Sequence, residues 1–210
     1  MKAALFDLDG TLLDSLGVWA DIDRAFLAQR GFEIPADYVS SIRGLSFLQT
    51  AQYTKERFHL KESAGRIAEI WHEMCREAYT HRVKLKPGAK EYLQKLKSLG
   101  TGLAVVTTLT EQLYEPVLKR NGVYSLFNVF ATTDETGLDK KSGAVYLLAA
   151  NRMGAEPEDC TVYEDITEGL LGAKAAGMKA VLVYDSHNLD SLDENRSLAD
   201  DYIQSYLDLI

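Results

Sequence analysis

The chain has 210 residues, which is long enough for one large domain or for a domain that carries an insertion. Hydrophobic residues make up 46% of it, and no stretch approaches the roughly 20 apolar residues that a membrane span needs. The formal net charge of −8 argues against nucleic acids and anionic membranes as partners.

Neither of the two cysteines is expected in a disulfide. Cys75 falls within a helical apolar pattern and Cys160 opens a strand, so both are predicted to be buried free thiols. The first strand begins at once and leaves no room for a signal peptide. We therefore expect a cytoplasmic protein and, by default, a monomer.

The first element in the chain is a short strand that leads into two closely spaced carboxylates. Apolar residues 3–6 precede Asp7 and Asp9, and Gly10 with Thr11 completes the turn. Because side chains alternate along a strand, both acids are expected on one face, at the carboxyl end where α/β sheets hold ligands. Two acids this close repel each other, which favours a divalent cation between them. The alternative is an ordinary surface Asp-Gly turn.

Residues 15–84 contain no strand pattern, and they are more chain than one crossover helix needs. Two apolar stripes with helical spacing include Trp19 and Trp71, and residues 46–58 form a weaker third helix. We therefore expect an inserted helical cap domain over residues 15–84, whose two connections to the core run side by side. Such a domain can cover the end of the sheet that carries Asp7.

The rest of the chain alternates strands and helices. Strands are predicted at residues 3–8, 103–107, 129–132, 161–164 and 180–184, and helices at 88–99, 142–153 and 167–176. This order predicts an α/β fold with a doubly wound, Rossmann-like parallel sheet, formed by residues 1–14 and 85–210.

Polar residues follow the carboxyl ends of three later strands. Thr107 and Thr108 follow the second strand, Lys140 comes after a polar loop behind the third, and Glu164 with Asp165 ends the fourth. In a doubly wound sheet these strand ends converge on one crevice. Carboxylates, a hydroxyl, a lysine and free helix N–H groups are the composition of a site for a metal and a phosphate group.

Each of these residues also has a purely structural interpretation. Thr107 can be an ordinary strand-end hydroxyl, and Lys140 beside Lys141 can be one of a solvated pair. Asp165 can cap the following helix, although Thr167 competes for that position. Only the joint occurrence of these residues favours a site.

The order of the motifs resembles the haloacid dehalogenase-like superfamily, in particular its β-phosphoglucomutase and phosphoglycolate phosphatase branch. Residues 162–169, followed by residues 173–178, are similar to the fourth motif of that branch. All four motifs occur in order over essentially the whole chain, with a helical cap after the first. The resemblance implies a Mg²⁺-dependent enzyme that transfers phosphoryl groups.

The resemblance also implies a role for each candidate residue. Asp7 is expected to be the nucleophile that forms an aspartyl-phosphate, Asp9 the general acid and base, and Lys140 the group that holds the nucleophile and neutralises charge. The implied metal ligands are Asp7, Asp9 through its backbone carbonyl, Asp165 and, as a helper, Glu164. The implied phosphate-binding residues are Thr107 and Thr108.

One motif departs from the family pattern. The third motif of this branch usually reads Lys-Pro-x-Pro, whereas residues 140–143 read Lys-Lys-Ser-Gly. Loss of both prolines predicts a looser loop around Lys140, and with it a slower enzyme or an altered phosphate affinity. It also leaves open a member of the family that binds its ligand but has lost turnover.

The second acid and the cap separate the chemistries within the superfamily. Dehalogenases and phosphonatase-type members lack an acid at the position of Asp9, so phosphoryl transfer is favoured. β-Phosphoglucomutases carry a cap histidine where this chain has Trp19, and an arginine where it has Phe47 after the phrase 44–46. Trp19 and Phe47 offer apolar, stacking surfaces for a substrate, although cap aromatics are more often bundle core. We expect a phosphatase acting on a small phosphorylated metabolite such as a sugar phosphate, with a phosphosugar mutase as the alternative.

A response-regulator receiver also groups acids, a threonine and a lysine around a parallel sheet. Receivers carry no insertion of this length, and they do not place the phosphoacceptor in an Asp-x-Asp-Gly-Thr turn at the first strand. The layout therefore argues against a signalling module.

Overall fold

The computed structural model describes residues 2–42 and 47–210, without the side chains of Ser40, Phe47 and Asp190. The chain forms two compact units. The core unit consists of Met1–Leu16 and Val83–Ile210, and the helical unit consists of Gly17–Arg82. The helical unit is thus inserted between the first strand and the remainder of the core unit.

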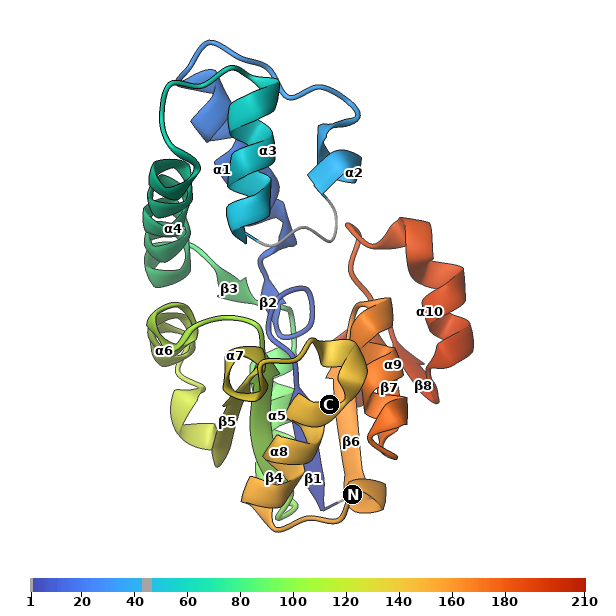
Figure 1. The fold of residues 1–210 in the computed structure, drawn as a ribbon. Helices are drawn as coiled ribbons and strands as arrows, with labels where there is room; N and C mark the ends of the chain where they lie inside the picture. The colour runs from blue at the N-terminus through green and yellow to red at the C-terminus, as the bar shows by residue number, and fades with distance from the viewer. Residues whose placement is uncertain (1, 43–46) are drawn as a thin grey trace. The chain divides into compact units, whose positions relative to one another are not determined.

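The core unit contains a parallel sheet of six strands in the order β5-β4-β1-β6-β7-β8 (Figure 1). The strands are β1 Ala3–Phe6, β4 Gly102–Thr107, β5 Val129–Thr132, β6 Cys160–Glu164, β7 Lys179–Val183 and β8 Asp201–Ile203. Because β1 lies between β4 and β6 and the chain continues outward on both sides, the predicted doubly wound α/β sheet is confirmed. Strand β8 was not predicted, since its three residues include Asp201 and give no continuous apolar run.

Helices of the core unit connect the parallel strands. They are α5 Ala89–Ser98, α6 Glu111–Arg120, α7 Thr133–Thr136, α8 Ala144–Met153, α9 Thr167–Ala175 and α10 Leu192–Leu198. Three of the crossovers, α5, α8 and α9, match helices that the apolar periodicity predicts, to within two residues at each end. No helix among the described residues is long and apolar enough to cross a membrane.

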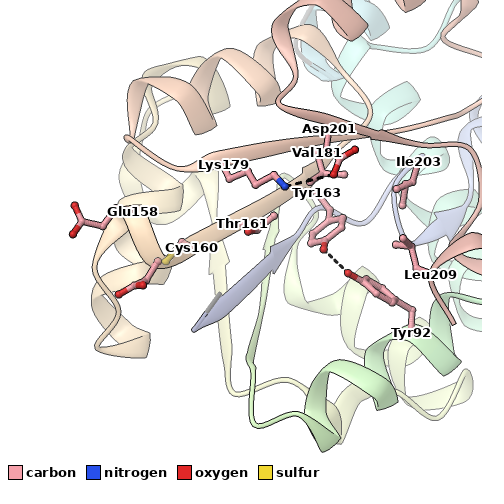
Figure 2. A pocket seen from close by; sticks show the side chains of 11 residues that line it. Tyr92, Glu158, Cys160, Thr161, Tyr163, Lys179, Val181, Asp201, Ile203 and Leu209 are labelled. Atoms are coloured by element: carbon pink, nitrogen blue, oxygen red, sulfur yellow. Dashed lines mark hydrogen bonds and ion pairs between the residues drawn. The ribbon is translucent and has the colours of Figure 1, made fainter.

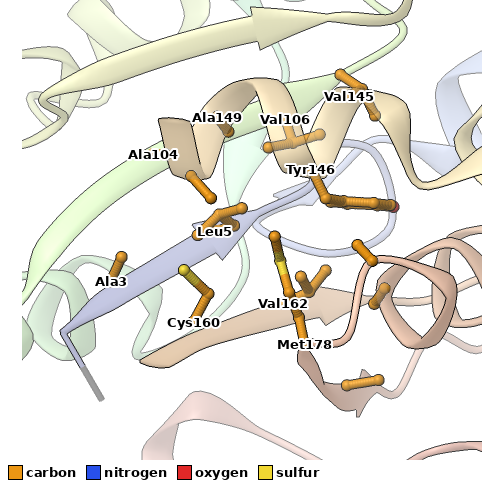
Figure 3. Packing of buried hydrophobic residues seen from close by; sticks show 14 of the residues in the cluster. Ala3, Leu5, Ala104, Val106, Val145, Tyr146, Ala149, Cys160, Val162 and Met178 are labelled. Atoms are coloured by element: carbon orange, nitrogen blue, oxygen red, sulfur yellow. The ribbon is translucent and has the colours of Figure 1, made fainter. Parts of the chain in front are cut away.

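The two faces of the sheet bury alternate side chains of the same strands. Leu5 and Val162 belong to a cluster that includes residues of α8 and α9 (Figure 3). Phe6 lies on the opposite face, where it stacks on Tyr163 with ring centroids 4.4 Å apart and contacts Tyr92 of α5 edge-on. Both faces are therefore covered, which is why these strands are continuous apolar runs in the sequence.

Two short strands connect the core unit to the inserted segment. β2 (Leu13–Asp14) pairs antiparallel with β3 (Lys84–Leu85). The backbone N–H of Lys86 donates to the carbonyl of Leu12 at 2.9 Å and extends this pairing. The two connections thus run side by side, as predicted.

The described residues of the helical unit form the helices α1 Leu16–Ala28, α2 Tyr38–Ile42, α3 Phe47–Arg57 and α4 Ala64–His81. Phe26 of α1 and Trp71 of α4 pack edge to face with ring centroids 5.3 Å apart. Helix α2 has five residues, too few for an apolar periodicity to predict it. Cys75 in this unit and Cys160 in the core unit are buried and form no disulfide within the described part of the chain, as predicted.

Candidate active site

The site begins with Asp7, which directly follows β1. Its backbone N–H donates to the carbonyl of Tyr163 at 3.1 Å, so the register with β6 continues one residue past the strand. Glu164 ends β6 and Asp165 follows it, and both are almost completely buried. One carboxylate oxygen from each of these three acids lies within 4.8 Å of the other two. The central strands of the parallel sheet therefore bring Asp7, Glu164 and Asp165 together at their carboxyl ends.

Lys140 lies between two of these acids. Its Nζ donates to Oδ1 of Asp7 and, at 2.6 Å, to Oε1 of Glu164. Burial alone lowers the pKa of the Lys140 ammonium, but the charges of Asp7 and Glu164 outweigh that effect and raise its pKa above the ordinary value. Lys141 is exposed, so the structure brings only the first lysine of the pair to the acids.

Glu164 and Asp165 lie in a poorly solvated environment. Burial, with the charge of Asp7, raises the pKa of Glu164, and the Lys140 ammonium opposes that rise. Burial, together with the charges of Asp7 and Glu164, raises the pKa of Asp165 well above its ordinary value. One lysine does not neutralise three carboxylates, so full ionisation of the cluster requires a further positive charge.

The residues of the cluster fit a divalent cation with oxygen ligands. Oε2 of Glu164 is buried and has no hydrogen-bond partner. The ligand atoms available here are carboxylate oxygens. Mg²⁺, Ca²⁺ and Mn²⁺ prefer oxygen ligands, whereas zinc and copper sites more often contain nitrogen or sulfur ligands. The unpartnered Oε2 of Glu164, together with the carboxylates of Asp7 and Asp165, can provide ligands for such an ion.

The turn after Asp7 is built around Gly10. Its φ of +74° is the left-handed conformation that glycine adopts readily, and its N–H donates to the carbonyl of Leu13 at 3.1 Å. A Cβ at this position would lie 2.2 Å from Oδ2 of Asp165. Thr11 donates from Oγ1 to Oδ1 of Asp165 at 3.1 Å. Gly10 and Thr11 therefore fit this turn against the acid that follows β6.

Asp9 has a different environment from Asp7. Its side chain is half-buried, and Oδ1 accepts a hydrogen bond from Oγ of Ser15 at 2.6 Å. Its carboxylate is not part of the three-acid cluster formed among the residues that the structure describes. The carboxylates of Asp7 and Asp9 thus have different surroundings, although the two residues are only two positions apart.

The hydroxyls predicted to bind phosphate lie at the carboxyl end of the neighbouring strand β4. Thr107 is the last residue of β4 and is buried, and its Oγ1 accepts from the N–H of Leu109 at 3.1 Å. This bond uses an acceptor site and leaves the hydroxyl proton of Thr107 for another partner. Thr108 is exposed at the same end of the strand.

The comparisons with known proteins agree on one family. The profile of the haloacid dehalogenase-like hydrolases matches residues 4–183. The chain belongs to the haloacid dehalogenase-like hydrolase family. Validoxylamine A 7′-phosphate phosphatase of Streptomyces hygroscopicus is 32% identical to it over 206 residues, which are 92% of this chain and 90% of that protein.

Other members of the family are similar over most of their length. The phosphorylated carbohydrates phosphatase of Thermotoga maritima is 26% identical over 181 residues, which are 86% of this chain and 84% of that protein. A crystal structure of a candidate β-phosphoglucomutase, also from Thermotoga maritima, superposes with a TM-score of 0.85 at 26% identity. The match covers 100% of this chain and 98% of that one.

In this member of the haloacid dehalogenase-like hydrolases, the third motif is fixed without its prolines. Residues Lys140–Ser142 form a 3₁₀ turn, and Asp139 caps it by accepting from the N–H of Ser142 at 3.1 Å. Gly143 ends the turn with a φ of +79°. Residues 140–143 thus form a capped turn, in which the Asp139 side chain accepts a backbone hydrogen bond and Gly143 adopts the left-handed conformation that ends the turn. A slower enzyme or an altered phosphate affinity stays a prediction.

Asp165 does not cap the helix that follows it. The N-cap of α9 is Ile166, so neither Asp165 nor the alternative candidate Thr167 caps this helix. The prediction that Thr167 is the N-cap is wrong, because the Thr167 hydroxyl donates to Oδ1 of Asn195 at 2.7 Å instead. Asp165 is left with its carboxylate in the acidic cluster.

The cap residues predicted to contact substrate belong to the helical unit. Trp19 lies in α1, is half-buried and packs edge-on against Tyr79 with ring centroids 6.4 Å apart. Phe47 is the first residue of α3, and its side chain lies outside the described part of the chain. The phrase 44–46 also lies outside the described residues.

Tyr146 and Asn188 contact the acids of the site without belonging to any of the motifs, and Gly169 of the fourth motif lies close to Glu164. Tyr146 of α8 donates to Oε1 of Glu164 at 2.6 Å, and Asn188 donates to Oδ2 of Asp165 at 2.5 Å. A Cβ at Gly169 would lie 2.2 Å from Cδ of Glu164. The repeated glycines of the fourth motif are a sequence signal for such close contact, whereas a lone tyrosine or asparagine carries no signal of this kind.

A separate cavity of about 450 Å³ lies along β6, β7 and β8, and its lining on β6 extends from Cys160 to Tyr163 (Figure 2). Its lining includes Cys160 and Lys179, the first residues of β6 and β7, and the hydrogen-bonded hydroxyls of Tyr92 and Tyr163. Glu164 is the last residue of β6. The acidic cluster therefore begins at the last residue of β6, beyond the residues of this strand that line the cavity.

Proposed function

We propose that this hydrolase is a Mg²⁺-dependent phosphatase that removes the phosphoryl group from a small phosphorylated metabolite through an aspartyl-phosphate intermediate. The observation that carries the proposal is the buried cluster in which Lys140 binds Asp7 and Glu164 beside Asp165. A nucleophilic carboxylate held by a lysine and grouped with acids that fit a divalent cation suits attack on a phosphate ester.

The metal site in this proposal consists of Asp7, the backbone carbonyl of Asp9 and Asp165, with Glu164 helping to hold the ion. When bound, Mg²⁺ would screen the negative charges of the carboxylates and the phosphate. The unpartnered Oε2 of Glu164 supports this assignment, because a buried carboxylate oxygen otherwise has no compensation for lost hydration.

The chemical steps follow from the residues around Asp7. A carboxylate oxygen of Asp7 attacks phosphorus, a new O–P bond forms and the bond to the leaving oxygen breaks. Asp9 gives its proton to that oxygen and then removes a proton from the water that attacks the aspartyl-phosphate. Phosphate leaves and Asp7 is regenerated. Lys140 holds Asp7 in place and stabilises the charge on the transferring group, to which Thr107 and Thr108 donate hydrogen bonds.

The different environments of the two acids support this division of labour. Asp7 is buried and accepts a hydrogen bond from the Lys140 ammonium, which holds its carboxylate in place for attack. Asp9 is half-buried and accepts from the Ser15 hydroxyl outside the three-acid cluster, which suits a separate role in proton transfer. The relatives named for phosphatase activity on phosphorylated carbohydrates and on validoxylamine A 7′-phosphate favour a phosphorylated sugar or a similar polyol as substrate.

The proposal is tested with p-nitrophenyl phosphate and Mg²⁺, with Asp7→Asn as the matched variant. We expect phenolate release by the wild-type chain, its loss in Asp7→Asn, and a phosphorylated Asp7 that is trapped in the wild-type chain by rapid acid quench. Equal phenolate release by both proteins would show that the activity does not depend on Asp7.

The phosphosugar mutase remains the second candidate, because the chain also resembles the candidate β-phosphoglucomutase over its full length. It is tested by supplying β-glucose 1-phosphate together with a sugar bisphosphate activator. A phosphatase releases phosphate faster than it forms the isomer. Isomer formation that outpaces phosphate release would favour the mutase.

A further inference from the structure

Both carboxylate oxygens of Asp165 receive a hydrogen bond from a neutral side chain. Thr11 donates to Oδ1 at 3.1 Å, and Nδ2 of Asn188 donates to Oδ2 at 2.5 Å and to the Asp165 carbonyl at 3.4 Å. Asp165 is 2% exposed, so these bonds replace water that the carboxylate has lost. Thr11 belongs to the first motif, whereas Asn188 belongs to the loop between β7 and α10.

The chemistry of Asn188 suits a carboxylate that has to bind a cation. An ionised carboxylate only accepts hydrogen bonds, so the amide must present its Nδ2 and not its oxygen to Asp165. A lysine or arginine in this place would also donate, but its charge would repel a metal ion. Asn188 thus orients Asp165 and stabilises the ionised carboxylate without adding positive charge.

The loop that carries Asn188 is itself anchored. Asp185, buried at the start of the loop, accepts from the backbone N–H of His187 at 2.9 Å and pairs with Nζ of Lys86 at 2.9 Å. Lys86 also donates to the carbonyl of Tyr184 at 2.6 Å. The backbone N–H of Asn188 donates to the Asp185 carbonyl at 3.2 Å. The amide of Asn188 is therefore presented from a fixed backbone.

A second asparagine fixes the backbone at the same point. Nδ2 of Asn195 donates to the carbonyl of Asp165 at 3.4 Å, and its Oδ1 accepts from the hydroxyl of Thr167. Asn195 is 1% exposed. The segment after β7 therefore holds both the main chain and the side chain of Asp165. Within this segment Asn188 contacts the carboxylate, whereas Asn195 contacts the carbonyl.

We propose that Asn188 is a positioning residue for the metal ligand Asp165, which it holds in the orientation that binds the divalent cation. The inference rests on the proposed function, because it assumes that Asp165 is a metal ligand. Asn188 acts through Asp165 and takes no part in proton transfer. Its removal is expected to weaken the metal affinity while the maximal rate at saturating Mg²⁺ falls much less.

The test measures Mg²⁺ binding by isothermal titration calorimetry on the full chain without substrate. Side chains that orient metal ligands typically contribute about 10–100-fold to metal affinity. We expect the Mg²⁺ Kd to rise by about tenfold or more in Asn188→Ala and in Asn188→Leu, which keeps the branched side-chain skeleton but removes the amide. In p-nitrophenyl phosphate assays, the Mg²⁺ concentration for half-maximal rate should rise in parallel, with kcat changed less than threefold by the same argument.

Asn128→Ala is the matched control. The Asn128 Oδ1 accepts from the N–H of Leu103 and from Nζ of Lys97, at the opposite end of β4 from Thr107. This variant also loses side-chain hydrogen bonds to the core unit but should bind Mg²⁺ as the wild-type chain does. Circular dichroism establishes that each variant is folded before it is titrated.

The outcomes separate this inference from the proposed function. A wild-type chain that does not bind Mg²⁺ contradicts the metal-dependent function itself. A wild-type chain that binds Mg²⁺, with a Kd unchanged within about twofold in folded Asn188→Ala or Asn188→Leu, overturns the role of Asn188. An equal loss of affinity in Asn128→Ala would overturn it as well, because the effect would then follow from general destabilisation.

Discussion

The ammonium of Lys140 lies against the carboxylate of Asp7, and each side chain is only 6% exposed. The two residues are 133 positions apart in the chain. Their contact depends on the register between β1 and β6, which places Asp7 beside Glu164, and on the 3₁₀ turn that directs Lys140 to both acids. One buried lysine therefore pairs with two buried carboxylates in the core unit.

Replacement of Lys140 by methionine is expected to impair both catalysis and stability. The variant leaves Asp7 and Glu164 buried without their counter-charge, which destabilises such sites by about 3–5 kcal/mol. Loss of a group that stabilises the transferring charge lowers kcat by about 10²–10³-fold. Urea unfolding of the metal-free protein and p-nitrophenyl phosphate hydrolysis with Mg²⁺ measure the two effects.

Lys141→Met is the control for this prediction, because Lys141 is adjacent and exposed. Its unfolding free energy should stay within about 0.5 kcal/mol of the wild-type value, as is usual for surface positions. Similar effects of the two substitutions would contradict the assignment of Lys140 as the lysine of the site.

Gly10→Ala is expected to disrupt the acidic cluster. Alanine at a φ of +74° is strained by about 1–2 kcal/mol. In addition, its Cβ would lie 2.2 Å from Oδ2 of Asp165, so that carboxylate must move. We expect loss of the Mg²⁺-induced increase in melting temperature, measured by thermal denaturation with and without the ion.

Gly100→Ala separates the backbone strain from this contact. Gly100 has a φ of +79°, and a Cβ there would meet nothing within 4 Å. It should lose a comparable amount of stability, about 1–2 kcal/mol, yet keep the full Mg²⁺-induced shift. A Gly10→Ala protein that responds to Mg²⁺ as well as Gly100→Ala does would show that Asp165 tolerates the displacement.

Asp23 in α1 gives a prediction about pH. Burial raises the pKa of Asp23 to about 6, well above the ordinary value of an aspartate. The folded chain therefore binds a proton more tightly than the unfolded chain does, and this contribution to stability falls as the pH rises through about 6. At pH 8 the buried carboxylate is ionised and destabilises the helical unit. Asp23→Asn should raise the unfolding free energy at pH 8 by about 1–3 kcal/mol, and the gain should shrink toward pH 4.

Urea unfolding at several pH values measures this dependence, and Asp21→Asn provides the control. Asp21 lies in the same helix, but its side chain is 65% exposed and pairs with Arg24. Its substitution should leave the slope of stability against pH close to that of the wild-type chain. A slope in Asp23→Asn that equals the wild-type slope would mean that the Asp23 carboxyl is solvated in the folded protein.

The local patterns of the sequence predict much of the core unit. Continuous apolar runs predict five of the six strands, because strands covered on both faces have few polar positions. They do not predict β8, an edge strand of three residues, or the five-residue helix α2. Elements this short carry no complete period, so their existence depends on the neighbours against which they pack.

The acids and the lysine of the site are also readable in the sequence, since each follows a predicted strand or precedes a predicted helix. Tyr146 and Asn188 are not, because each lies in a segment whose own pattern gives no reason to single it out. The choice between Lys140 and Lys141 likewise depends on the turn that Asp139 caps. Whether these side chains contact the acids depends on the direction in which each side chain points and on its distance from the acids. The local sequence does not encode either quantity.

The sequence alone therefore determines the family, the order of the motifs and the acids proposed to bind a metal, since these depend on residue type and spacing. The tertiary structure decides which groups hold those acids. It places Lys140 between Asp7 and Glu164, and Asn188 against Asp165. Hydrogen bonds form only within about 3.5 Å, and strand register and loop anchoring bring groups so distant along the chain to that separation.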